Sequence, residues 1–148
     1  MEENVDSLIR QFVVFKLGIE EYGMDIKKVV TIEKMMPIAR VPKAPIFIKG
    51  VINLRGEIIP IMDLRSRIDF PLIEETENTR IIIIKIDEIN IGIIIDEVDE
   101  VIQFKSNEIE NITNFCSDIS LDYIFGAGKI NNRIVTLLNL EKLVKFGQ

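Results

Sequence analysis

The hydrophobic residues of this chain occur in short runs separated by turn residues, and this pattern favours β-strands over long helices. Isoleucine is the main residue of these runs, and its restricted χ1 angle suits a pleated sheet. Paired strands are expected at residues 12–17 with 22–25, 50–54 with 57–62, and 80–86 with 91–95. Pro60 lies within one of these strands, which predicts an edge or bulge position because proline has no N–H to give to a ladder.

Two short helices are expected, each preceded by a side chain that can accept a hydrogen bond from the first turn. Asp63 is placed to cap a helix over residues 64–68, and Asn139 is the matching cap of a C-terminal helix within residues 139–146. The acidic and polar segment 70–79 separates the two halves of the chain. Prolines mark an irregular loop in the first half, at Pro37, Pro42 and Pro45.

The two halves present the same order of hairpin, short strand, hairpin and helix, which indicates an internal repeat. At an offset of 69 residues Gly23 aligns with Gly92, and at an offset of 76 residues Asp63 aligns with Asn139. The expected fold class is mainly β, with two five-stranded barrels packed together and short helices. Closure into barrels is expected because it removes the exposed edges of isoleucine-rich strands.

The repeat also suggests domain boundaries. A single domain over residues 1–148 is expected, with one barrel over 11–70, completed by the C-terminal segment, and a second over 80–138. A half of about 70 residues is marginal for independent folding, so the two barrels are expected to share an apolar layer.

Composition excludes several classes of function. The chain has no histidine and a single cysteine, Cys116, so it can form no histidine-dependent catalytic pair, no thiolate zinc site and no internal disulfide. A net charge of −6 disfavours nucleic acid and anionic membranes as partners. No signal peptide or membrane-spanning apolar run is visible, so a cytosolic protein without cofactor or metal is expected.

The acidic pairs in the second half do not have the spacing of a calcium-binding loop. Asp96-Glu97 and Asp99-Glu100 flank apolar strand residues, and they are interpreted as a solvated face of the protein.

Arg55 lies at the expected tip of the central hairpin, and Gly56 is expected to supply the positive φ that such a turn needs. A guanidinium on a rigid turn presents a planar set of donors, which suits recognition of a partner's carboxylate or backbone carbonyl groups. A solvated arginine in a weak surface ion pair fits the sequence equally well. Both interpretations stay open from the residues alone.

The segment around this turn, residues 47–65, reads F-I-K-G-V-I-N-L-R-G-E-I-I-P-I-M-D-L-R. It resembles the signature of the CheW family of chemotaxis coupling proteins, F-I-K-G-V-x-N-L-R-G-x-I-x-P-[IV]-x-D-L-R, and matches every fixed position of that pattern. Residues 21–26 resemble the family's E-Y-G-I-D-I stretch, and residues 91–98 resemble its V-G-x-x-V-D-x-V stretch. The likeness runs from about residue 11 to residue 146.

This resemblance implies two SH3-like barrels and a non-enzymatic role as an adaptor. The family bridges the cytoplasmic tip of methyl-accepting chemoreceptors to the regulatory domain of the histidine kinase CheA, in arrays at the inner face of the membrane. Carried over to this chain, the receptor-binding residues are Val29, Gly50, Arg55, Val98 and Val101. The kinase-binding residues are Ile38, Val41 and Phe115.

Two positions depart from the family pattern. Thr31 stands where many members carry a glutamate that can pair with the arginine of the turn, and Glu33 or Glu57 is the expected substitute. Glu110 stands where some relatives carry arginine, so the polarity of one kinase contact is expected to differ. The alternatives are a CheV-type coupling domain and a small ligand-binding barrel, and the lack of histidine and of a glycine-rich phosphate loop disfavours an enzyme.

Overall fold

The computed structural model describes residues 8–111 and 121–145, and strands predominate in this part of the chain. The strands are β1 (Ile9–Leu17), β2 (Glu20–Asp25), β3 (Val29–Lys34), β4 (Ile48–Leu54), β5 (Glu57–Asp63), β6 (Arg80–Ile86), β7 (Ile89–Ile95), β8 (Glu97–Lys105), β9 (Ile109–Glu110), β10 (Ile124–Ile130) and β11 (Arg133–Leu138). The short helices are α1 (Leu64–Arg67), which follows β5, and α2 (Leu140–Leu143), which follows β11. Single 3-10 turns lie at Ile26–Lys28, Ser106–Glu108 and Leu121–Tyr123.

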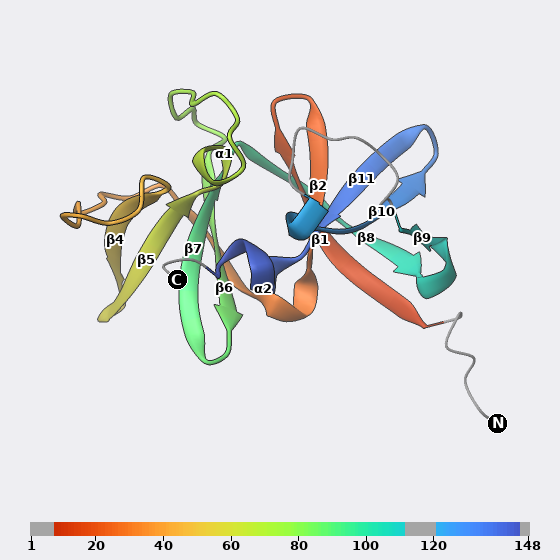
Figure 1. The fold of residues 1–148 in the computed structure, drawn as a ribbon, viewed down its shortest axis with the longest axis horizontal. Helices are drawn as coiled ribbons and strands as arrows, with labels where there is room; N and C mark the ends of the chain where they lie inside the picture. The colour runs from red at the N-terminus through yellow and green to blue at the C-terminus, as the bar shows by residue number, and fades with distance from the viewer. Residues whose placement is uncertain (1–7, 112–120, 146–148) are drawn as a thin grey trace.

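The strands form two sheets that lie side by side along the long axis of the molecule, with the two helices near the middle (Figure 1). Sheet A has the order β8-β1-β2-β11-β10-β9, and sheet B has the order β3-β6-β7-β5-β4. The mainly β fold class predicted from the sequence is confirmed. Sheet A has six strands rather than the five expected for each barrel, because it also contains the two-residue strand β9.

Each sheet combines strands from both halves of the sequence. The hairpin β1–β2 lies in sheet A with β8 to β11, and the hairpin β6–β7 lies in sheet B with β3 to β5. The expected barrel ranges, 11–70 and 80–138, are therefore not those of the sheets, and β6–β7 rather than the C-terminal segment completes sheet B. A repeat in the sequence identifies equivalent strands, but it does not say which copy each strand pairs with.

The strand registers confirm the internal repeat itself. Gly92 lies opposite Ile61 in the parallel pair of β7 and β5, and Gly23 lies opposite Leu137 in the parallel pair of β2 and β11. A Cβ atom at Gly92 would lie 2.5 Å from Ile61 Cδ1, and one at Gly23 would lie 3.0 Å from Leu137 Cδ2. Both glycines therefore permit a close approach within their own sheet.

The hydrophobic core has three parts. The cluster of sheet A consists of Phe12, Val14, Ile102, Phe104, Val135 and Leu137. The cluster of sheet B consists of Ile52, Ile59, Ile61, Ile81 and Ile83. A larger central cluster joins both sheets and both helices, and includes Phe15, Tyr22, Met62, Ile82, Ile84, Leu64 and Leu140. This central cluster is the shared apolar layer that the sequence predicted.

The unbroken isoleucine run at residues 81–84 follows from this arrangement. Ile81 and Ile83 face the cluster of sheet B, while Ile82 and Ile84 face the central cluster. Successive side chains of a strand point to opposite faces, so a strand buried on both sides reads as a continuous apolar run rather than an alternating one.

The helix caps are those predicted from the sequence. The Asp63 side chain accepts a hydrogen bond from the backbone N–H of Ser66, and the Asn139 side chain accepts one from that of Lys142. By contrast, the edge or bulge position expected for Pro60 is wrong, because β5 has neighbours on both sides and the irregularity of the β4–β5 pair lies between Ile48 and Gly50, whereas Pro60 pairs with Val51. The parallel ladder to β7 begins only at Ile61, so Pro60 lies outside that ladder.

Arg67 ties the two helices together at the seam between the sheets. Its guanidinium carbon lies 4.5 Å from the centre of the Phe47 ring and 4.7 Å from that of Tyr123. Its Nε donates a hydrogen bond of 2.7 Å to the carbonyl of Leu143. A flat cation between two rings gains from both their faces, so Arg67 stabilises the contact between the repeats.

Candidate functional site

Two of the residues carried over as receptor contacts lie where the chain passes from one sheet to the other. Val29 begins β3 and Val98 is the second residue of β8, each just after a crossing between the sheets. Val29 lies opposite Ile84, and Val98 lies opposite Phe15. Both valines are half-buried against the central cluster. They occupy equivalent points on the edge strands of the two sheets.

Exposed aliphatic side chains continue along the same two strands. Val101 in β8 is 49% exposed, and Ile32 in β3 is 40% exposed. Val101 lies opposite Val13 and Ile32 lies opposite Ile82, so the two are also equivalent in the repeat. The two edge strands, β3 and β8, therefore offer apolar side chains to a partner at the seam.

Gly50 is buried beneath a neighbouring loop. Its φ angle is +149°, and a Cβ atom there would lie 2.1 Å from the carbonyl oxygen of Ala39. Ala39 and Val51 pair through two backbone hydrogen bonds, of 2.9 and 2.8 Å. Gly50 therefore allows the β3–β4 loop to lie close to β4. Because Gly50 is buried and has no side chain, it can affect a partner only through the position of this loop.

The turn at Arg55 has the two residues expected from the sequence, Arg55 and Gly56. Both Arg55 and Gly56 have positive φ angles, of +52° and +88°, as in the two-residue turns favoured by hairpins. The side chain of Asn53 accepts a hydrogen bond of 2.9 Å from the N–H of Gly56. The prediction that Gly56 supplies a positive φ is confirmed, and Arg55 supplies a second.

The Arg55 side chain is held weakly. It is 76% exposed, and its Nη2 lies 3.8 Å from Oε2 of Glu33. The same oxygen accepts a hydrogen bond of 2.9 Å from Thr31. Of the two acids expected to replace the family glutamate, Glu33 is the one that pairs with Arg55, while Glu57 accepts a hydrogen bond from Asn90.

Two of the three residues carried over as kinase contacts, Ile38 and Val41, lie in the β3–β4 loop beside sheet B. Ile38 packs half-buried against the cluster of sheet B, and Val41 in the same loop is 43% exposed. Ile38 also lines a hollow of about 570 Å³ between the β3–β4 and β5–β6 loops, together with Ile48 and Ile94. Phe115 lies outside the described residues.

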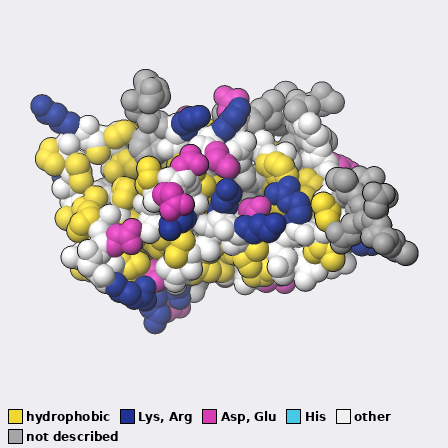
Figure 2. All heavy atoms as spheres, turned by 90° about the horizontal axis from the view of Figure 1, so that it is seen from below, with side chains coloured by type: hydrophobic (Ala, Val, Ile, Leu, Met, Phe, Trp, Pro, Cys, Tyr) yellow, Lys and Arg dark blue, Asp and Glu magenta, His cyan; other side chains and the backbone are white. Residues whose placement is uncertain are grey.

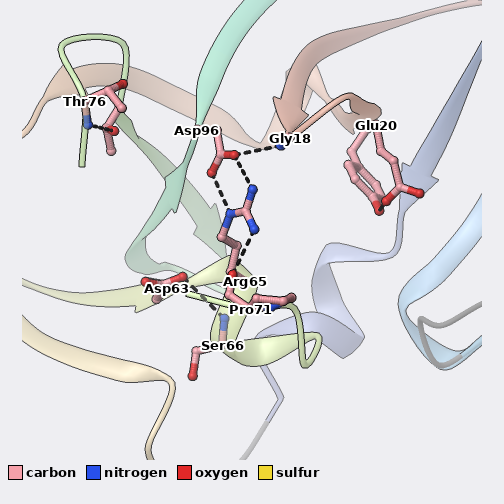
Figure 3. A network of polar contacts seen from close by, with 10 residues as sticks. Gly18, Glu20, Asp63, Arg65, Ser66, Pro71, Thr76 and Asp96 are labelled. Atoms are coloured by element: carbon pink, nitrogen blue, oxygen red, sulfur yellow. Dashed lines mark hydrogen bonds and ion pairs between the residues drawn. The ribbon is translucent and has the colours of Figure 1, made fainter. Parts of the chain in front are cut away.

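A half-buried ion pair holds the crossing that follows β7 (Figure 3). Arg65 on α1 donates hydrogen bonds of 2.9 and 2.6 Å to the two carboxylate oxygens of Asp96. The N–H of Gly18 in the β1–β2 turn donates a third, of 2.7 Å, to Asp96. Arg65 also donates to the carbonyl of Pro71, at 2.8 Å. This network joins α1, both sheets and the β5–β6 loop.

The network sets the protonation state of Asp96. Burial raises the pKa of its carboxyl group, but the hydrogen bonds from Arg65 and Gly18 lower that pKa by more, so it lies below its ordinary value. The interpretation of Asp96 as a solvated acid is therefore wrong. No local pattern indicates its partner, because Arg65 belongs to another element of the chain.

A second network surrounds Arg133 on sheet A. Its guanidinium donates to Glu21 in β2, and also to Asp99 and Glu100 in β8, at 3.0 and 2.8 Å. The hydrogen bond from Arg133 lowers the pKa of Glu21, and the carboxylates raise the pKa of Arg133. Asp99 and Glu100 are thus ion-paired acids rather than purely solvated ones.

A family model described as CheW-like domain matches residues 11–147. The chain belongs to the CheW-like domain family. The resemblance noted in the sequence is thereby confirmed.

The CheW-like assignment agrees with individual relatives. The chain is 36% identical to a chemotaxis protein CheW of Klebsiella aerogenes, covering 91% of this chain and 81% of that protein. It is 37% identical to the chemotaxis protein CheW of Bacillus subtilis, covering 90% of this chain and 86% of that protein. The crystal structure of the scaffolding protein TtCheW from Thermoanaerobacter tengcongensis matches with a TM-score of 0.88 at 34% identity, over 94% of each chain.

The CheW-like chain has surface features suited to recognition. Figure 2 shows hydrophobic side chains gathered toward the end that carries sheet B, while acidic and basic side chains intermingle across the middle. Among the described residues, no group of three or more acidic or cysteine side chains is placed to hold a metal ion. No helix in the same residues has the length and apolar character needed to cross a membrane.

Proposed function

We propose that this CheW-like protein is a non-enzymatic adaptor that couples methyl-accepting chemoreceptors to the histidine kinase CheA in chemotaxis. The match of residues 11–147 to the CheW-like domain carries the proposal. The relatives named as chemotaxis proteins and as a scaffolding protein support it. An adaptor needs complementary surfaces and no reactive groups, which accords with a chain that has no histidine. In this role the protein works in the cytoplasm, at receptor arrays beneath the membrane.

The proposed receptor surface follows the edge strands β3 and β8. Val29, Val98 and Val101 would contact the apolar face of a receptor helical hairpin, in the manner of a helix bound in a groove. Arg55 would add donors at the end of this surface, because its exposed guanidinium is only weakly paired with Glu33. Gly50 would contribute indirectly by shaping the loop that crosses β4.

The described part of the proposed kinase surface is the β3–β4 loop, rather than the edge strands β3 and β8. Ile38 and the exposed Val41 in the β3–β4 loop, together with Phe115, would contact the regulatory domain of CheA. Separate surfaces let one chain bind both partners at once. Individual contacts of modest strength are sufficient, because repeated attachment within an array raises the effective concentration of each partner.

The direct test is a reconstitution of kinase activity. Purified protein is mixed with a receptor signalling fragment and CheA, and CheA autophosphorylation is measured with and without the protein. The proposal expects receptor-dependent stimulation that requires the protein. An autophosphorylation rate that does not depend on the protein would refute the adaptor role.

A pair of matched variants tests the receptor surface. Val101→Ser should weaken binding of the receptor fragment by about 1 kcal/mol, roughly fivefold in Kd, because it removes exposed apolar area at the seam. Ile19→Ser makes a similar change on the β1–β2 turn, where Ile19 is 96% exposed, and should leave the Kd unchanged. Equal Kd values for both variants would show that the receptor fragment does not bind at Val101.

A further inference from the structure

The two crossings between the sheets are each tied to a helix by an ion pair. At the crossing after β7, Asp96 pairs with Arg65, the second residue of α1. At the crossing after β2, Lys28 pairs with Glu141, the second residue of α2, at 3.4 Å. The two helices are equivalent in the repeat, and so are the two crossings. The helix members of the two pairs, Arg65 and Glu141, are equivalent in the repeat, while the crossing members, Asp96 and Lys28, differ by one position.

The two pairs differ in polarity and in burial. The helix supplies the cation in the first pair and the anion in the second. The Arg65 and Asp96 side chains are only 12% and 18% exposed, whereas those of Lys28 and Glu141 are 38% and 58% exposed. A bidentate ion pair between side chains that are mostly buried is strong, while an ion pair between exposed side chains is weak and is screened by salt. One crossing is therefore firmly held, and the other is loosely held.

Each crossing leads directly into one of the two half-buried valines, Val29 and Val98. Lys28 is followed by Val29, and Asp96 precedes Val98 by two residues. Because β3 and β8 belong to different sheets, the angle between the sheets decides how the two valines lie relative to each other. An ion pair that fixes a crossing to a helix of the central cluster restricts this angle.

There is space beside the loosely held helix. Glu141 lines a hollow of about 340 Å³ that lies between α2 and the β6–β7 hairpin, with Ile86, Ile91 and Val144 also in its walls. A small shift of α2 toward this hollow would not meet packed side chains on that side.

We propose that Arg65–Asp96 and Lys28–Glu141 are positioning pairs that set the placement of β3 relative to β8, and that Lys28–Glu141 is the pair that adjusts when a receptor tip binds. The positioning of the strands is a property of this chain alone. Only the adjustment on binding rests on the proposed function.

The test reverses the exposed pair. Lys28→Glu, Glu141→Lys and the double swap are compared with wild type by residual dipolar couplings of the backbone amides in β3 and β8, and by calorimetric titration with a receptor signalling fragment. Each single variant should change the orientation of the sheets and weaken binding by about twofold to fivefold. The double swap should restore the couplings and bring the Kd to within about twofold of wild type.

Lys129→Glu is the matched control. Lys129 is exposed near the end of β10, whose neighbours in sheet A are β9 and β11, so it lies on neither crossing. It makes the same change in net charge as Lys28→Glu, and it should alter neither readout. The two single variants at the crossing change net charge in opposite directions, so a shared loss of affinity cannot come from net charge.

The outcomes separate this inference from the proposed function. Dipolar couplings that are unchanged in Lys28→Glu, or that the double swap does not restore, would overturn the positioning role. A Kd equally weakened by Lys129→Glu would overturn the adjustment on binding. A wild-type protein that fails to bind the receptor fragment would count against the proposed function, while the couplings would still decide whether the pairs position the strands.

Discussion

Replacing Asp96 by asparagine tests whether the half-buried ion pair at the second crossing stabilises the fold. The carboxylate accepts two hydrogen bonds from Arg65 and one from Gly18. An asparagine offers one carbonyl oxygen, and its NH2 group would face N–H donors where the second carboxylate oxygen now lies. The guanidinium of Arg65 would lose its counter-charge while remaining largely enclosed.

The expected loss in the free energy of unfolding follows from the burial of the Arg65 and Asp96 side chains. Removing one member of a fully buried pair costs about 3–5 kcal/mol. Because the Arg65 and Asp96 side chains are 12% and 18% exposed, water can recover part of this loss. We therefore expect Asp96→Asn to lower the free energy of unfolding by about 2–4 kcal/mol and Tm by roughly 5–15 °C.

The pH dependence gives an independent check. The pKa of Asp96 lies below its ordinary value in the folded protein, so the ion pair stabilises the fold above the unfolded-state pKa of about 3.9. This contribution is lost as the pH falls through the lower, folded-state pKa. The stability difference between wild type and Asp96→Asn should thus be constant near neutral pH and should shrink below about pH 4.

The assay is urea unfolding followed by far-ultraviolet circular dichroism, from neutral pH down to the acid limit of the folded state. Glu97→Gln, which removes the charge of the exposed neighbouring acid, is the control and should change stability by less than about 0.5 kcal/mol. A loss below about 1 kcal/mol in Asp96→Asn, or a difference that does not depend on pH, would refute the reasoning.

Three further predictions concern packing and can be checked by thermal unfolding. Gly50→Ala should lower the free energy of unfolding by more than about 3 kcal/mol, because the new Cβ would meet a backbone carbonyl. Gly56→Ala has open space around it and should lose only about 1 kcal/mol, through its positive φ. Similar losses in the two variants would contradict this reasoning. Gly92→Ala should lose about 1–2 kcal/mol by overpacking the cluster of sheet B, while Gly23→Ala, with looser contacts, should stay within about 0.5 kcal/mol of wild type. Arg67→Lys should lose about 1–2 kcal/mol because an ammonium cannot lie flat between two rings, and an unchanged Tm would show that stacking contributes little.

Local signals in the sequence predicted the elements well. Runs of branched aliphatic residues predicted the hairpins, and Asp63 and Asn139 predicted where the two helices begin. The matched glycines, Gly23 and Gly92, gave the repeat and its offset, which the strand registers confirm. These features depend on neighbouring residues, so a local pattern is sufficient to indicate them.

The candidate site was only partly predictable. The resemblance named Val29, Val98 and Val101 as receptor contacts, but it did not show that they lie on the edge strands of different sheets. Glu33 was one of two possible partners for Arg55, and only the spatial approach of β3 to the central hairpin distinguished it from Glu57.

Most strands, the helix caps, the duplication and the family can be predicted from the residues alone, because each depends on residue types at short, regular spacings. The exchange of the first hairpins of the repeats between the sheets is visible only in the folded protein. An exchanged and an unexchanged arrangement bury the same residues on the same faces, so the hydrophobic pattern is identical in both. The ion pairs at the crossings were decided in the same way, since they join side chains that approach each other only after the sheets have packed.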